Sequence, residues 1–160
     1  MEKTTSVEEV LIEETFNASI ERVFSAWTDP EKLMQWYAPE GCTITFKKLD
    51  IRKGGSFHSC ITHPVHGACW AIGEYLDIQP NKKIVFTLLN ADENGEPVNP
   101  ADIGMDADWP RQTLVTVTFS EENGQTKLVL RQTVAQQLAK KTGAYPSWLQ
   151  MLQHMRAIVE

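Results

Sequence analysis

Apolar residues along the chain alternate between the two-residue spacing of strands and the three- and four-residue spacing of helices. Residues 7–16 mix β-branched and acidic side chains and predict a first strand. A helix is predicted next, capped by Asn17 or Ser19, because apolar residues follow at i, i+3, i+4 and i+7, namely Ile20, Val23, Phe24 and Trp27.

A second short helix is predicted directly after the first. Asp29 is a good N-cap, and Pro30 suits the first helical position, where its missing N–H removes no hydrogen bond. Leu33 and Trp36 then face the interior, and Pro39 ends the helix.

Strands follow in close succession, separated by turn residues. Their predicted ranges are 42–51, 56–62, 68–79, 84–91, 112–121 and 126–134. The last two are joined at Asn123-Gly124, a favoured hairpin turn. Short connections imply an antiparallel meander.

A final amphipathic helix opens at Pro146 or Ser147. Its apolar residues are spaced by four, three and four, at Trp148, Leu152, Met155 and Val159. A one-sided helix of this length is covered best by a one-sided sheet. The predicted fold class is therefore α+β: a curved antiparallel sheet of six or seven strands wrapped around the C-terminal helix, with two short helices between the first two strands.

Composition limits the classes of function. The 160 residues suit one domain with a core of about residues 9–159, and 42% hydrophobic residues argue against disorder. The net charge of −6 and the scattered basic pairs disfavour a nucleic-acid partner, which needs a concentrated basic face.

The expected location is the cytoplasm. Met1–Ser6 has no apolar segment typical of a signal peptide, and no apolar run has the length of a membrane span, which needs about 20 residues. Cys42, Cys60 and Cys69 are then expected to be reduced thiols.

The order of elements resembles the helix-grip fold of the START-like, birch-pollen-allergen-like superfamily (SRPBCC). Within it, the chain is most similar to proteins related to the C-terminal domain of the heat-shock protein 90 ATPase activator. The similarity spans about residues 9–159 and is carried by Val23–Trp27 with Thr28-Asp29-Pro30, Leu33, Trp36, Pro39, Asp50–Gly55, Gly73–Pro80, Val115–Val117, Phe119, Trp148 and Leu152. The resemblance implies binding of a small hydrophobic molecule.

The expected ligand-binding cavity lies between the concave sheet face and the last helix. The candidate lining residues are large and apolar: Trp36, Tyr37, Phe57, Tyr75, Phe86, Val115, Val117, Trp148, Leu152 and Met155. The alternative is that these side chains only fill the core, as large apolar residues usually do.

Residues 92–111 form a long, acidic, turn-rich segment that we expect to be flexible. Loops of this length in small domains are usually functional or mobile. Two interpretations are open: a flap without a ligand role, or a lid that uses Ile103, Met105 and Trp109.

Asp50 and Arg52 are expected on one face of a strand. They form either a surface ion pair or an anchor for a ligand carboxylate or phosphate. Gly54-Gly55 is expected to form a turn.

No metal site and no cofactor are predicted. The segment with Cys60, His63, His66 and Cys69 has soft ligands, but their spacing matches no common zinc module. We expect a hairpin with two exposed imidazoles instead.

Three functions are compatible with this fold. The first is binding of a small hydrophobic or aromatic molecule. The second is a small cavity-based enzyme of the cyclase or hydrolase type, for which Glu74, Tyr75, His58 and Arg131 could supply acid–base groups. The third is a chaperone-interaction module. The chain carries no common catalytic motif, so an enzyme is less favoured than a binder. A homodimer is compatible with all three.

Overall fold

The computed structural model describes residues 8–160 and confirms the predicted succession of elements. In chain order these are β1 (Glu9–Phe16), α1 (Ile20–Thr28), α2 (Pro30–Trp36), β2 (Thr43–Leu49), β3 (Ser56–His63), β4 (Gly67–Gln79), β5 (Lys83–Ala91), the 3₁₀ helix η1 (Pro100–Ile103), β6 (Gln112–Glu122), β7 (Gln125–Ala135), α3 (Gln136–Thr142) and α4 (Ala144–Val159). Val7, the first residue of the expected strand, and Met1–Ser6 lie outside the described residues.

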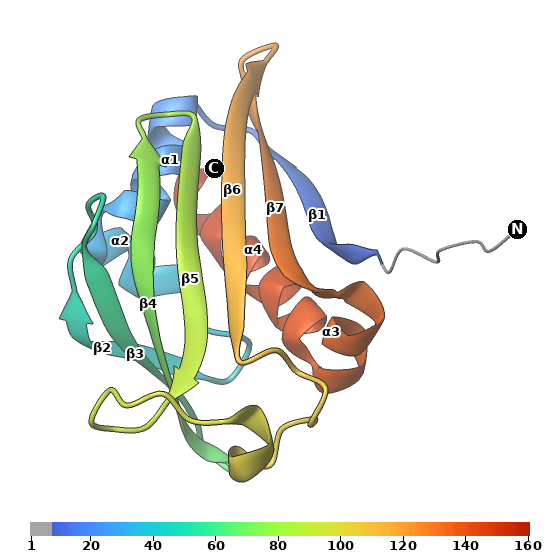
Figure 1. Cartoon of the computed structure of the whole chain (residues 1–160). Helices are drawn as coiled ribbons and strands as arrows, with labels where there is room; N and C mark the ends of the chain where they lie inside the picture. Colours follow the sequence, from blue (N-terminus) through green and yellow to red (C-terminus); the bar gives the residue numbers. More distant parts are fainter. Residues whose placement is uncertain (1–7) are drawn as a thin grey trace, which may run out of the picture.

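Seven strands form one antiparallel sheet in the order β1-β7-β6-β5-β4-β3-β2. The chain crosses from β1 at one edge to β2 at the other through α1 and α2. It then returns strand by strand until β7 pairs with β1. Figure 1 shows the sheet curving around α4, which lies behind it. The predicted α+β helix-grip class is confirmed.

Local capping explains where the two short helices begin. The Ser19 hydroxyl accepts a hydrogen bond from the Arg22 N–H at 3.2 Å, and the Asp29 carboxylate accepts one from the Glu31 N–H at 3.0 Å. The Trp36 indole N–H donates to the Ala26 carbonyl at 2.8 Å. This last bond ties α2 to α1.

The C-terminal helical region differs from the expectation in two respects. α3 was not expected, and α4 begins at Ala144 rather than at Pro146 or Ser147. Gly143 is the reason, because it adopts a left-handed φ of 93° that separates the two helices. Pro146 lies in the first turn of α4, where N–H groups have no partner within the helix.

The apolar stripe of α4 is buried as predicted, and the end of the helix is fixed to β1. Arg156 donates to the Glu14 carboxylate at 2.7 Å and to the Thr15 carbonyl at 2.8 Å. Its guanidinium also lies 4.5 Å from the centre of the Phe16 ring. These contacts hold the helix under the sheet.

The expected strand over residues 42–51 is shorter in the structure. β2 ends at Leu49, so Asp50 and Arg52 lie in the turn to β3 and not on a strand face. The turn closes because the Gly55 N–H bonds to the Arg52 carbonyl at 2.8 Å. Asp50 and Arg52 form the expected surface ion pair, with an N–O distance of 2.9 Å.

Within residues 8–160, no helix is both long enough and apolar enough to cross a bilayer.

The close approach of β4 to its neighbours gives a test of the fold. A Cβ at Gly73 would collide with the Thr87 carbonyl and the Phe57 ring. We expect Gly73→Ala to lower the free energy of unfolding by about 1–3 kcal/mol through overpacking. In urea denaturation, the control Glu74→Ala on the exposed side of β4 should change it by less than about 0.5 kcal/mol. Equal stability of the two variants would contradict this packing.

Candidate functional site

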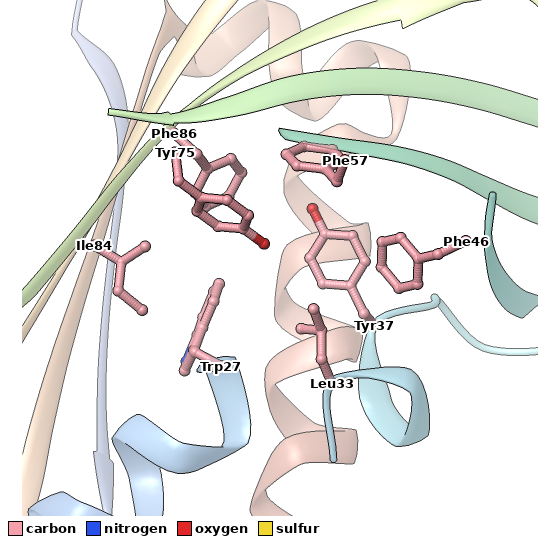
Figure 2. A pocket seen from close by; sticks show the side chains of 8 residues that line it. All are labelled: Trp27, Leu33, Tyr37, Phe46, Phe57, Tyr75, Ile84 and Phe86. Atoms are coloured by element: carbon pink, nitrogen blue, oxygen red, sulfur yellow. The ribbon is translucent and has the colours of Figure 1, made fainter. Parts of the chain in front are cut away.

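A small space, the inner cavity, lies between α1, α2 and the sheet. Its volume is about 20 Å³, and Figure 2 shows its lining: Trp27, Leu33, Tyr37, Phe46, Phe57, Tyr75, Ile84 and Phe86. A space of this size holds about one water molecule. It is too small for an organic ligand.

Two tyrosine hydroxyls point into the inner cavity (Figure 2). Burial raises the pKa of Tyr37 because the phenolate would be desolvated. Burial also raises the pKa of Tyr75, and the neighbouring Tyr37 raises it further. Both side chains are therefore neutral hydroxyls at physiological pH.

A larger space, the loop pocket, lies between the concave sheet face, the start of α4 and the loop after β5. Its volume is about 200 Å³. Its lining is mostly apolar and comprises Tyr37, Ser59, Ile61, Cys69, Ala71, Leu88, Leu89, Asn90, Met105, Trp109, Thr113, Gln132, Ala144, Ser147, Trp148 and Met151. Tyr37 lines both spaces and forms the wall between them.

The acidic loop closes one side of the loop pocket. Met105 and Trp109 contribute to the lining, whereas Ile103 lies in a wider outer groove that shares Met105 with the pocket. An ion pair of 3.0 Å between Asp106 and Lys141 joins the loop to α3. The Asp108 N–H, and secondly Lys141, lower the pKa of Asp106.

A chain of hydrogen bonds crosses one wall of the loop pocket. The Trp148 indole N–H donates to Gln132 Oε1 at 3.0 Å, and Gln132 Nε2 donates to the Thr113 hydroxyl at 3.0 Å. Thr113 and Gln132 are each only 2% exposed. These two polar groups are buried, and they line the pocket together with the polar residues Ser59 and Asn90.

The ten predicted lining residues separate into three groups. Tyr37, Phe57, Tyr75 and Phe86 surround the inner cavity, and Tyr37 and Trp148 line the loop pocket. The remaining five, Trp36, Val115, Val117, Leu152 and Met155, are fully buried and line neither space. Four of the six predicted aromatic residues therefore surround the inner cavity.

Most residues of the loop pocket were not among the candidates. Many are small or polar, such as Ser59, Ala71 and Gln132, whereas the candidates were large apolar side chains. A usable pattern exists on β6 and β7. Gln132 interrupts a run of apolar residues on the inward-facing positions of β7, and Thr113 directly precedes such a run on β6.

The acid–base candidates do not meet in one place. Tyr75 lines the inner cavity, His58 and Glu74 lie along a different, open groove, and Arg131 lies near β1. The loop pocket is lined by no Asp, Glu, His, Lys or Arg.

At the β3–β4 hairpin the His63 and His66 rings lie 4.5 Å apart between their centres. His63 Nδ1 accepts hydrogen bonds from the N–H groups of Val65 and His66, which closes its own turn. Within residues 8–160, no cluster of three or more His, Cys, Asp or Glu side chains has a metal-binding arrangement.

A curved antiparallel sheet closed over a C-terminal helix, with an apolar pocket between them, defines the START-like helix-grip class. The chain belongs to the family described as Activator of Hsp90 ATPase homolog 1-like protein, which matches residues 17–160. This confirms the resemblance stated from the sequence. None of the curated proteins matches the chain.

Solved structures share the fold over nearly the whole chain. One from Staphylococcus epidermidis is 25% identical, with a TM-score of 0.78 over 99% of this chain and 93% of that one. One from Arthrobacter aurescens is 21% identical, with a TM-score of 0.80 over 98% and 92%. The AHSA1 protein of Silicibacter pomeroyi is 19% identical, with a TM-score of 0.73 over 94% and 96%. The last two show the fold alone.

The two buried tyrosines predict a loss of stability at alkaline pH. Below about pH 10 both are protonated in the folded and the unfolded chain. Above it the unfolded chain loses these protons and the folded chain keeps them, so unfolding is favoured as pH rises. Each tyrosine should contribute a slope of at most about 1.4 kcal/mol per pH unit.

Urea denaturation from about pH 8 to about pH 11 measures this slope. The double variant Tyr37→Phe, Tyr75→Phe keeps both rings but has no phenolic protons, so its loss of stability above pH 10 should be shallower. The same pH dependence in both proteins would show that the hydroxyls are not buried.

Proposed function

We propose that this protein binds a small, mostly aromatic molecule in the loop pocket. The observation that carries the proposal is the apolar space of about 200 Å³ between the sheet and α4. Apolar pockets with a few polar groups are the usual form of small-molecule sites. We expect the protein to act in the cytoplasm.

The volume sets the size of the ligand. An engineered apolar cavity of about 150 Å³ binds benzene. The loop pocket is about one third larger, so it suits one aromatic ring with a short substituent. Tyr37, Trp109 and Trp148 would provide aromatic contacts on different sides of such a ring.

We propose the loop after β5 as the lid of this pocket. It contributes two large side chains, Met105 and Trp109, and the Asp106–Lys141 ion pair holds it against α3. The side chains involved are on a connection and not on the sheet. The lid can therefore move while the other walls keep their hydrogen bonds.

The other two functions have less support. An enzyme of this type would need acid–base groups at the pocket, and the four candidates lie elsewhere or apart. The family description refers to an activator of the Hsp90 ATPase, and a chaperone partner stays a prediction from that resemblance. A homodimer likewise stays a prediction.

Filling the pocket should abolish binding without unfolding the protein. Ala71→Leu places three additional carbon atoms in the loop pocket. We expect the Kd for acetophenone, measured by heteronuclear NMR titration, to rise at least about tenfold. Ala157→Leu adds the same atoms on the exposed side of α4 and should leave the Kd unchanged.

The protein resonances that shift when acetophenone is added should belong to residues of the loop pocket. If neither acetophenone nor α-methylstyrene shifts them, the proposed function is wrong. Equal affinity of the Ala71→Leu and Ala157→Leu variants would place the ligand elsewhere.

Removing one lid side chain should weaken binding. Trp109→Ala removes an indole that lines the loop pocket, and we expect the Kd to rise about fivefold or more. Ile103→Ala is the matched control, since Ile103 lies on the same loop, is 47% exposed and lines only the outer groove. Fluorescence or NMR titration distinguishes the two. An unchanged Kd for Trp109→Ala would contradict the lid.

A further inference from the structure

The hydrogen bonds in the wall of the loop pocket have a fixed direction. An indole N–H can only donate, so the oxygen of Gln132 must face Trp148. The amide nitrogen of Gln132 then faces Thr113 and donates to its hydroxyl. The Thr113 oxygen is therefore an acceptor in this chain of bonds, and its own proton points elsewhere.

That proton has no acceptor among the side chains and backbone of residues 8–160. The second N–H of Gln132 has none either, since its first one is used by Thr113. Both groups line the loop pocket and are 2% exposed, so only molecules inside the pocket can reach them. Unmatched buried donors are costly, and a ligand that accepts from them gains accordingly.

The charge around the pocket selects among acceptors. No Lys, Arg or His lines the loop pocket. Residues 92–111 carry six acidic residues and one Arg, and the whole chain has a net charge of −6. A carboxylate or phosphate would lose its hydration there without meeting a cation. A ligand cation would bring donors to Thr113 and Gln132, which already present donors.

We infer that the ligand of this pocket is a neutral molecule whose oxygen acceptor, such as a ketone or ester carbonyl, faces Thr113 and Gln132 while its ring lies among the apolar side chains. This inference rests on the proposed function and adds the chemical class and orientation of the ligand. The resemblance and the family described above specify neither.

A ligand pair tests the inference together with a variant pair. Acetophenone carries the carbonyl oxygen, and α-methylstyrene has a CH₂ group in its place with nearly the same shape. Thr113→Val removes the donor at almost constant volume, and Thr113→Ser keeps it. Relative to wild type, Thr113→Val should raise the Kd for acetophenone about 3- to 10-fold, which corresponds to the loss of one hydrogen bond. The Kd for α-methylstyrene should not change.

Thr113→Ser should retain the affinity for acetophenone within about twofold, because the hydroxyl is kept. Benzoate should bind wild type at least about tenfold more weakly than acetophenone. An equal effect of Thr113→Val on both neutral compounds, or tighter binding of benzoate, would overturn the inference. Failure of both neutral compounds to bind would instead overturn the proposed function on which it rests.

Because Thr113→Val also leaves Gln132 without its acceptor, that variant can fail to fold. A measurement on the wild-type protein then tests whether the ligand carbonyl accepts a hydrogen bond. The carbonyl stretching band of bound, ¹³C-labelled acetophenone should lie at lower frequency than in hexane, since a donated hydrogen bond weakens the C=O bond. An unshifted band would show that neither donor reaches the ligand.

Discussion

The aromatic cluster at the junction of α2 and α4 determines which part of the sheet interior is filled and which stays open. Trp27 lies 4.7 Å from Trp36 and 6.4 Å from Trp148 between ring centres, and Tyr37 lies 6.0 Å from Trp148. Beyond the cluster on one side, Phe57, Tyr75 and Phe86 are mutually packed and leave only the inner cavity. On the other side, the loop pocket remains.

The cluster can act as a wall because its backbone is fixed to α4. The His154 Nδ1–H donates to the Ala38 carbonyl at 3.0 Å, and the Glu40 N–H donates to the Gln150 side chain at 2.9 Å. The segment that carries Tyr37 therefore cannot slide into the open side without breaking both bonds. The pocket persists for a second reason: its sheet and helix walls carry small residues, among them Ala71 and Ala144. Small side chains at these positions cannot reach across the space that the curved sheet leaves.

The sequence was sufficient for the fold because the signals for each element are local. The stripe that begins at Ile20, the Asp29-Pro30 start of α2 and the Asn123-Gly124 hairpin each specify their element within a few residues. Asn123 and Gly124 indeed adopt the positive φ angles of 53° and 79° that this turn requires. The turn containing Asp50 was misplaced by two residues, because its closure depends on backbone bonds that side-chain alternation does not reveal. α3 was missed because Gly143 divides one helical region into two.

The site was harder to predict than the fold because a pocket consists of positions where side chains fail to meet. Val115 and Leu152 are as apolar as Phe57, but both are buried in the core and line neither space. Trp148 is a candidate that does line the loop pocket, because its large side chain reaches both the core and the pocket. Which small residues border empty space depends on the curvature of the whole sheet, and this is not encoded in any short segment.

Gln132 shows how a buried polar residue can indicate function where apolar residues cannot. An apolar side chain at its position would continue the run that Leu128 and Leu130 begin on β7, and it would need no hydrogen bonds. Gln132 instead satisfies the Trp148 indole and leaves one donor directed to no other group of residues 8–160. A core built for stability alone gains nothing from such a donor, since a half-satisfied polar network is worse than an apolar one. Under the proposed function, an acceptor that enters the pocket would complete this hydrogen-bond network, which an apolar core at the same place would not need.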